Sequence, residues 1–499
     1  MKNNFSLSIV ISLLISCSNK EIIKLPITTS SDEALSFYNK AMLHAEVFDG
    51  LEKRQSLDSA LALDSNFVMA LEMYGSNNDL IKRKHQEKAK RLSTKVTESE
   101  RKRLKIRQSY RSGDMDAALK AAQWLVDNHG DSYESYLWLG QVQSDRREFN
   151  DAIESLKTAI SLNPDSYEAY EKLMGHHIGM GGQSMLAEEK RDVETGIKYG
   201  DQLIRIRPDA GLSYHFKANC YRQLGEFEKA KPLYEKSIEK RKGKASEGNS
   251  YNVSAHNYMF SGDFQTARKQ YNLAISLAKT DWQWFLREFY LTVSYIFEND
   301  YIGAIDNINK VEKELLQREV DETTETNMIY WLSFQKMICY AHNQMEEEAY
   351  GALNKAVKTN KEYANLMNDE NITRVAATES VRLNAWVNAL FGKYEKARKN
   401  LESLKSQLVK LNDPTAMYGY YSLSGFTSLM EGNFKEALLD FEKGNPTDIY
   451  YNYFKALALK ADGKEKDAEK LLIQIANVNF SDWDIAIVRN LAIKQLGNT

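Results

Sequence analysis

Small and aromatic residues recur at fixed spacing along the chain. A glycine, an aromatic residue two positions later and an alanine three positions after that occur together in segments 225–230, 262–267, 392–397 and 432–437. Looser copies precede Ala118, Ala152, Ala304 and Ala468. Another small residue lies twelve positions before most of these alanines, as at Gly140, Ala218, Ala255, Ala385, Gly425 and Ala456. The pattern predicts pairs of helices that share one short turn.

Each part of the pattern has a physical reason. Two antiparallel helices approach closely only where small side chains face each other, so each helix supplies a Gly or Ala at the crossing. A glycine ends the first helix in the left-handed conformation at little cost, because it lacks Cβ. The aromatic residue that follows, such as Phe227 or Phe264, packs back into the pair. We therefore expect repeated helical hairpins.

The interval between successive hairpins identifies the repeat. The interval from Ala118 to Ala152 corresponds to one repeat. The intervals from Ala230 to Ala267 and from Ala267 to Ala304 are slightly longer. This spacing resembles that of the tetratricopeptide repeat, whose period is about 34 residues. Segments 133–166 and 211–244 match it best, and the resemblance covers roughly residues 34–480. It implies an all-α solenoid of about 11–12 helix pairs.

Two departures from the regular spacing divide the predicted array. The interval between Met174 and Pro208 is longer than the repeat allows, so we expect a loop or a lengthened hairpin at His176–Lys190. Both steps between Ala304 and Ala397 also stretch well beyond the repeat period, which indicates longer helices or inserts in the turns. We predict an N-terminal array over residues 30–310 and an irregularly spaced C-terminal array over 311–480.

The sequence also indicates where two helices start and how the array ends. Ser30 with Glu33 predicts a capping box that starts the first helix, and Thr97 with Glu100 predicts another. Residues 481–499 predict a capping helix, with Trp483 and Ile487 on its inner face, because the last repeat of a solenoid needs a cover.

The N-terminus indicates export. A charged Lys2 precedes an apolar run over 5–15, which is too short to span a bilayer and long enough for a signal peptide. The sequence Leu14-Ile15-Ser16-Cys17 resembles the lipobox of bacterial lipoproteins. This resemblance implies a signal peptide over 1–16, acylation of Cys17, a lipidated tether over 17–29 and a place in the cell envelope. Ser18 implies the outer membrane, on its periplasmic or its outer face. A plain secretory signal is the alternative.

Composition and motifs narrow the function. The chain has 43% hydrophobic and 27% charged residues and a net charge of -3, which suits a folded protein and argues against general polyanion binding. Cys220 and Cys339 lie in apolar helical stretches, so we expect buried thiols. We find no catalytic motif and expect no enzyme, cofactor, metal site or nucleic-acid partner. The basic segment 82–107 is a solvated helical face or a surface for phosphate-bearing lipid head groups.

The resemblance implies a concave wall made by the first helix of each pair. We predict that His215, Asn219, Arg222, Asn252 and His256 line it as a polar stripe. Asn219 matches one position of the carboxylate clamp of chaperone-binding relatives, but the rest is missing. An extended or acidic ligand of another kind is the remaining expectation. The aromatic and apolar wall residues are either anchors for a partner or buried by contact within the chain: Trp331, Phe334, Ile338, Tyr450 and Tyr453.

These observations predict a lipid-anchored cell-envelope scaffold that binds a protein or peptide partner in the groove. One alternative is a solute-binding lipoprotein similar to the SusD-like glycan receptors, with Trp282 and Trp284 as a sugar platform. A second is an enzyme with its site at 175–195, where His176 and His177 are too few to hold a metal without further ligands.

Overall fold

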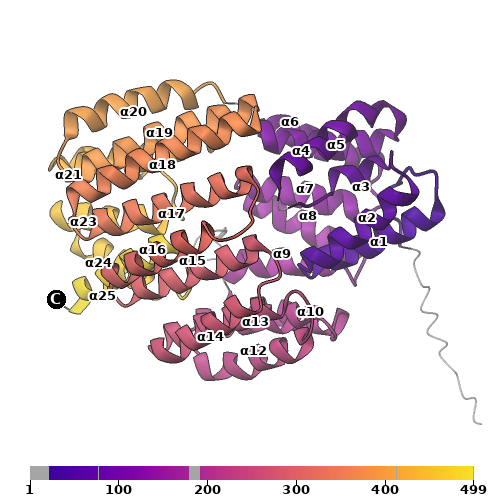
Figure 1. The fold of residues 1–499 in the computed structure, drawn as a ribbon, viewed down its shortest axis with the longest axis horizontal. Helices are drawn as coiled ribbons and strands as arrows, with labels where there is room; N and C mark the ends of the chain where they lie inside the picture. Colours follow the sequence, from indigo (N-terminus) through magenta and orange to yellow (C-terminus); the bar gives the residue numbers. More distant parts are fainter. Residues whose placement is uncertain (1–21, 77, 179–191, 412, 498–499) are drawn as a thin grey trace, which may run out of the picture.

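The chain folds as a stack of antiparallel helix pairs (Figure 1), seen in a computed structural model that describes residues 22–76, 78–178, 192–411 and 413–497. These residues form 25 α-helices and no strand. Twelve pairs run from α1/α2 to α23/α24, and α25 stands alone after them. The predicted all-α solenoid of 11–12 pairs with a closing helix is confirmed.

The first eight pairs contain helices of ordinary length, with one short member, α3. Their bounds are α1 (Asp32–Glu46), α2 (Gly50–Leu63), α3 (Val68–Glu72), α4 (Asp79–Leu92), α5 (Glu98–Ser112), α6 (Met115–Asn128), α7 (Tyr133–Asp145), α8 (Phe149–Leu162), α9 (Tyr167–Ile178), α10 (Val193–Ile206), α11 (Gly211–Gln223), α12 (Phe227–Arg241), α13 (Glu247–Phe260), α14 (Phe264–Ser276), α15 (Asp281–Phe297) and α16 (Tyr301–Leu315). A single 3-10 turn, η1 (Ser93–Lys95), joins α4 to α5.

The remaining helices complete the stack. Their bounds are α17 (Glu322–His342), α18 (Glu346–Met367), α19 (Glu370–Leu390), α20 (Tyr394–Leu408), α21 (Tyr418–Met430), α22 (Phe434–Phe441), α23 (Ile449–Ala461), α24 (Glu465–Ala476) and α25 (Trp483–Gly497). Helices α17, α18 and α19 each run for five turns or more, whereas most others have three or four. Longer helices therefore account for the stretched spacing between Ala304 and Ala397. The division into two arrays stays a prediction.

The helix pairs cross at the predicted small residues. Ala152, Ala230 and Ala267 are fully buried. A Cβ added to Gly140 would lie 3.0 Å from Cγ of Leu156 on the partner helix. Larger side chains at these positions would force the paired helices apart, which explains why the spacing of small residues in the sequence is so regular.

Most of the hairpin turns use a left-handed residue. Gly225 and Gly262 have φ of +73° and +88°, as the pattern predicts. Arg147, Asn299 and Gln344 occupy the same conformation with φ of 64°, 62° and 60°. A residue with a Cβ is strained there, so these three turns store strain that the glycine turns avoid.

We expect Gln344→Gly to raise the free energy of unfolding by about 0.5–1 kcal/mol, because it relieves that strain at an exposed position. Urea denaturation followed by circular dichroism would measure the change. Asn343→Gly is the matched control, since Asn343 lies in the same turn with φ of -88°. An equal gain from both substitutions would show that turn strain is not the cause.

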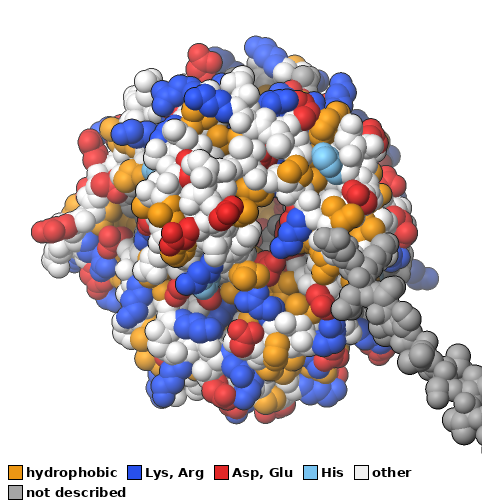
Figure 2. All heavy atoms as spheres, turned by 90° about the vertical axis from the view of Figure 1, so that its right-hand side faces the viewer, with side chains coloured by type: hydrophobic (Ala, Val, Ile, Leu, Met, Phe, Trp, Pro, Cys, Tyr) orange, Lys and Arg blue, Asp and Glu red, His pale blue; other side chains and the backbone are white. Residues whose placement is uncertain are grey.

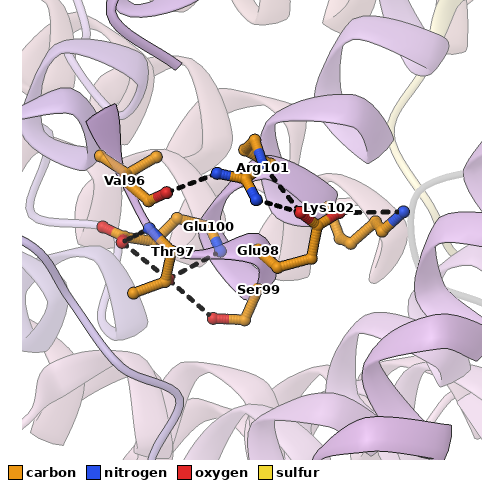
Figure 3. A network of polar contacts seen from close by, with 7 residues as sticks. All are labelled: Val96, Thr97, Glu98, Ser99, Glu100, Arg101 and Lys102. Atoms are coloured by element: carbon orange, nitrogen blue, oxygen red, sulfur yellow. Dashed lines mark hydrogen bonds and ion pairs between the residues drawn. The ribbon is translucent and has the colours of Figure 1, made fainter. Parts of the chain in front are cut away.

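The two predicted capping boxes have different outcomes. Thr97 caps α5 as expected: its Oγ1 accepts a hydrogen bond from the amide of Glu100, whose carboxylate accepts one from the amide of Thr97 at 3.0 Å (Figure 3). The box at Ser30 is wrong by one residue. Ser31 caps α1 through the amide of Ala34, because the amide of Ser30 donates to Asp64 at 2.9 Å.

The structure also bears on two further expectations. The predicted loop or lengthened hairpin at 176–190 is wrong at its start, because His176 to Ile178 belong to α9; residues 179–191 lie outside the described ranges. The lipidated tether over 17–29 stays a prediction, and the structure adds contacts for residues 22–29 that the sequence did not indicate. These residues form no helix, yet they lie against α5 and α7, and Leu25 is only 3% exposed.

The closing helix α25 does more than cover the last pair. It packs on α24 and α23 and also on α15, which comes far earlier in the chain. Asn490 donates a hydrogen bond to the backbone carbonyl of Phe297 at 2.9 Å. On the predicted inner face, Trp483 contacts Phe334 edge to face and Ile487 is buried. The C-terminus therefore folds back onto the middle of the stack.

Candidate functional site

A cavity of about 1000 Å³ lies inside the N-terminal part of the stack. Its helical lining comes from the first helix of each of the first eight pairs, α1, α3, α5, α7, α9, α11, α13 and α15. Lys24, Leu25 and Ile27 of the N-terminal segment, Phe480 near the C-terminus and several residues next to the helix ends also line it. Figure 2 shows a hollow on the face of the N-terminal repeats, with acidic and basic side chains around it. A volume of this size suits a ligand site.

All five residues of the predicted polar stripe line this cavity: His215, Asn219, Arg222, Asn252 and His256. They lie on the inward faces of α11 and α13, where residues three or four positions apart share one side of a helix. The predicted faces of these two helices therefore border the cavity, and binding of a partner there stays a prediction.

Arg222 and Asn219 are already engaged within the chain. Arg222 is 1% exposed, and its Nε donates to the backbone carbonyl of Asn479 at 3.1 Å. Its Nη1 donates to the hydroxyl of Tyr234, which donates in turn to Asn219 at 2.7 Å. The side chain of Asn479 donates back to the carbonyl of Arg222 at 3.0 Å. This network, which we call the Arg222 clasp, joins α11 to the segment before α25.

The other three stripe residues carry polar atoms without a hydrogen-bond partner among the described residues. These atoms are Nδ1 of His215, Oδ1 of Asn252 and Nε2 of His256. Burial, with nearby arginines, holds the pKa of both imidazoles well below the usual value. Both rings are therefore neutral at pH 7. They suit neutral polar groups of a ligand better than the acidic ligand that the sequence left open.

Carboxylates line the middle of the cavity, and sequence reasoning missed their role. Glu134 on α7 accepts a hydrogen bond from the amide of Leu25 at 2.7 Å, and burial raises its pKa. Glu168 on α9 pairs with Lys172 at 3.4 Å. Glu171 faces the cavity with its pKa raised by burial. Glu134 and Glu168 are one repeat period apart, and this spacing in the sequence could have indicated that they occupy similar positions in successive repeats.

The predicted aromatic wall is mostly used for packing. Phe334, Ile338, Tyr450 and Tyr453 are buried, whereas Trp331 remains 38% exposed. Phe334, Ile338 and Tyr450 line a small cavity of about 80 Å³ between α17, α19, α23 and α25. Contact within the chain, one of the two expected alternatives, therefore explains these four residues.

Trp284, one of the two tryptophans of the glycan-receptor alternative, is covered within the chain. Trp284 is 3% exposed, and the guanidinium of Arg318 lies 4.2 Å from its ring centroid. A sugar cannot stack on a ring that is covered in this way, so the SusD-like interpretation is not favoured. Cys220 and Cys339 are buried free thiols, as predicted, and burial raises the pKa of each to about 12.

The basic residues of segment 82–107 have different surroundings on α4 and α5. On α5, Nη2 of Arg103 donates to the carbonyl of Pro26 and Arg107 pairs with Glu72 at 3.1 Å, so both serve the fold. On α4, Lys82, Lys84 and Lys90 are exposed. Contact of α4 with lipid head groups stays a prediction.

The remaining expectations concern metal and membrane. His176 contacts Ser144 at 3.1 Å, and no group of three or more His, Cys, Asp or Glu in the described ranges could hold a metal ion. None of the helices that the structure describes is long and apolar enough to cross a bilayer.

The small cavity contains two acidic side chains, Asp448 and Asp484. Burial, with Asp482 and Asp448 nearby, raises the pKa of Asp484 to about 8. A folded-state pKa above the unfolded value of about 3.9 contributes stability that is full below pH 4 and is lost as the pH rises toward 8.

We expect Asp484→Asn to stabilise the protein by about 1–2 kcal/mol at pH 8 and to have little effect near pH 4, after allowance for partial solvation. Urea denaturation of both proteins across this range would measure the difference. Asp467→Asn on the exposed face of α24 is the control. A difference that stayed constant with pH would show that Asp484 titrates normally.

Comparisons with known proteins agree with the geometry. Models of the tetratricopeptide repeat match residues 106–167, 212–239 and 248–281. The chain contains tetratricopeptide repeats. These repeats are typical of protein-interaction scaffolds, which is the class of function that the array supports. No curated protein matches the chain in sequence.

Solved structures resemble parts of the tetratricopeptide array. TTC0263, a thermophilic TPR protein of Thermus thermophilus, is 22% identical, covers 38% of this chain and 96% of its own, and has a TM-score of 0.32. A tetratricopeptide repeat protein of Parabacteroides merdae ATCC 43184 is 15% identical, with coverages of 56% and 99% and a TM-score of 0.36. A Rap protein complexed with competence and sporulation factor is 16% identical, with coverages of 76% and 98% and a TM-score of 0.35.

Proposed function

We propose that the chain is a lipid-anchored scaffold of the cell envelope that binds a protein or peptide partner in the large cavity. One observation carries the proposal. Only first helices of the described repeat pairs contribute helical lining to the cavity, and His215, Asn252 and His256 present there polar atoms that the described chain does not satisfy. Such atoms cost free energy unless they bind water or a ligand.

The chemistry of this surface favours a polypeptide. Neutral imidazole and amide groups pair with the N–H and C=O groups of a backbone. Phe216, Val253 and Tyr290 lie beside them in the lining and would contact apolar side chains. A partner segment bound here would exchange its hydrogen bonds to water for bonds to these three polar residues.

Anchoring would keep the partner close to the membrane. Cys17 lies five positions before Ile22, the first described residue, and an extended chain of that length spans at most about 18 Å. Acylation of Cys17 would therefore hold the cavity beside the lipid surface. The outer membrane is the proposed location, on either of its faces.

The partner half of the proposal is tested by affinity purification from detergent-solubilised envelopes. We expect the double variant Asn252→Ala, His256→Ala to retain at least about 10-fold less partner than the unmodified chain, because two buried polar contacts are lost. Lys269→Ala, on the exposed face of α14, is the control and retains full binding. Equal recovery with all three proteins would refute binding at this surface.

Labelled palmitate tests the anchor separately. We expect the unmodified chain to incorporate the label and to fractionate with the outer membrane, and Cys17→Ser to lose both properties. Incorporation of label by the Cys17→Ser protein would refute the assignment of Cys17.

A further inference from the structure

The N-terminal segment, residues 22–30, binds the array as a peptide ligand would. The amide of Leu25 donates to Glu134 on α7 at 2.7 Å, and the amide of Thr28 donates to Glu100 on α5 at 2.9 Å. The hydroxyl of Thr28 donates to the same carboxylate at 2.6 Å. Between them, Arg103 donates to the carbonyl of Pro26 at 2.6 Å. Backbone groups of an extended segment are thus held by side chains of two successive first helices.

The carboxylates that hold this segment repeat with the array. Glu100, Glu134 and Glu168 follow one another at intervals of one repeat period, about 34 residues, and they lie at the N-terminal turns of α5, α7 and α9. We call these three residues the carboxylate ladder. Glu100 is held in place by the capping box of α5 (Figure 3), so its carboxylate is fixed before any ligand arrives. Glu168 lines the open cavity.

The spacing of the ladder matches the geometry of an extended peptide. Leu25 and Thr28 are three positions apart and contact successive first helices. A polyproline-type segment repeats every three residues and rises about 3.1 Å per residue, or about 9 Å per repeat. One helix pair of the array therefore corresponds to three residues of ligand, and Pro26, which has no amide, falls between two rungs.

Side chains of the segment add selectivity. Leu25 is buried in an apolar cluster with Ile106, Leu139 and Val142 of α5 and α7. The hydroxyl and amide of Thr28 together occupy both oxygens of Glu100. The wall therefore accepts an apolar residue at one rung and a hydroxyl residue three positions later.

We propose that the carboxylate ladder is a binding site for an extended polypeptide, with three residues of polypeptide for each repeat of the array. Residues 22–30 occupy this site within the chain. A partner segment of the same chemistry binds there by displacing them. Glu168 extends the ladder by one rung into the large cavity. The partner chemistry is an apolar residue followed, three positions later, by Thr or Ser, with free amides at both. This inference rests on the proposed function and deepens it, because it names the ligand class.

The test uses a fluorescent synthetic peptide of residues 22–31, Ile-Ile-Lys-Leu-Pro-Ile-Thr-Thr-Ser-Ser, and the full chain. Leu25→Asp in the chain removes the apolar anchor and places a like charge beside Glu134, which frees the ladder. We expect this variant to bind the peptide at least about 10-fold more tightly than the unmodified chain. Adding Glu134→Ala abolishes the gain, whereas Glu154→Ala, on the exposed side of α8, preserves it.

Peptides methylated on one backbone nitrogen test the three-residue spacing. Methylation at the positions of Leu25 or Thr28 removes a rung donor, and we expect each to weaken binding by about 10-fold or more. Methylation at the position of Ile27, which lies between the two rungs, is the control. Equal affinities of the three peptides, or no binding of any peptide to the folded Leu25→Asp chain, would overturn the ladder.

Hydrogen exchange of the unmodified chain decides the question if Leu25→Asp does not fold. A detachable segment exchanges the amides of Leu25 and Thr28 at least about 100-fold faster than core amides of α5 and α7, because it opens without unfolding the helices. Exchange at the same rate as those helices would show that the segment is a fixed part of the fold. Failure of the ladder leaves partner binding at Asn252 and His256 a separate question, answered by purification.

Discussion

Deleting residues 481–499 will lower the free energy of unfolding by at least about 5 kcal/mol. The deletion removes several buried apolar side chains and exposes to water the apolar surface that they cover. Ile485, Ile487 and Val488 are buried against α15, α23 and α24. Arg489 also lies over the ring of Phe260 on α13, 5.5 Å from its centroid. The deletion should therefore destabilise helices in the middle of the array as well as those at its end. Hydrogen exchange would show the amides of α13 and α15 losing protection with those of α24.

Two single substitutions in α25 separate burial from helix formation. Ile487 is 1% exposed and Ile493 is 46% exposed on the same helix. We expect Ile487→Ala to cost about 3 kcal/mol and Ile493→Ala less than about 1 kcal/mol, measured by urea denaturation. A truncated protein with unchanged stability, or equal effects of the two substitutions, would show that α25 does not close the array.

Arg222→Ala will destabilise the protein by about 3 kcal/mol, because it removes the buried donor to the carbonyl of Asn479 and the donor to the hydroxyl of Tyr234, which keeps only its bond to Asn219. The substitution also breaks the Arg222 clasp between α11 and the segment before α25. We therefore expect a second effect in the same experiment, a loss of amide protection in α25. Urea denaturation and hydrogen exchange measure the two effects.

Arg205→Ala is the matched control for Arg222. Arg205 forms an exposed ion pair with Asp165 at 2.8 Å, and such pairs contribute less than about 1 kcal/mol. Loss of stability without any change in the exchange of α25 would show that Arg222 acts within its own repeat and does not hold the C-terminal segment.

The sequence was sufficient for the architecture because local geometry repeats. Small residues such as Ala152 and Gly140, twelve positions apart, can meet only at a helix crossing, and glycines such as Gly225 mark the turns. The stretched intervals predicted longer helices or inserts in the turns, and α17 to α19 are longer helices. Arg147 and Asn299 take the place of the turn glycine in two other hairpins. The sequence pattern is weaker there, but the turn has the same left-handed backbone conformation.

The site was predicted only in part, because its remaining determinants are distant in sequence. The face of α11 and α13 follows from helical periodicity. The engagement of Arg222 depends on Asn479, which lies several repeats later, and no local pattern indicates that contact. Residues 22–29 were predicted to be part of a tether because they lack helical periodicity, and their contacts depend on Glu100 and Glu134 in other repeats.

A partner that binds inside the cavity formed by the first helices would lie within reach of the residues that line it. A photoreactive amino acid placed at Val253, in the cavity lining, and irradiated in intact cells tests this binding most directly. We expect one discrete crosslinked protein, absent when the photoreactive residue replaces Lys269 on the outer face of α14 and diminished by Asn252→Ala, His256→Ala in the same chain. Crosslinks of the same pattern from both positions, or none from Val253 while Lys269 gives one, would contradict binding inside the cavity.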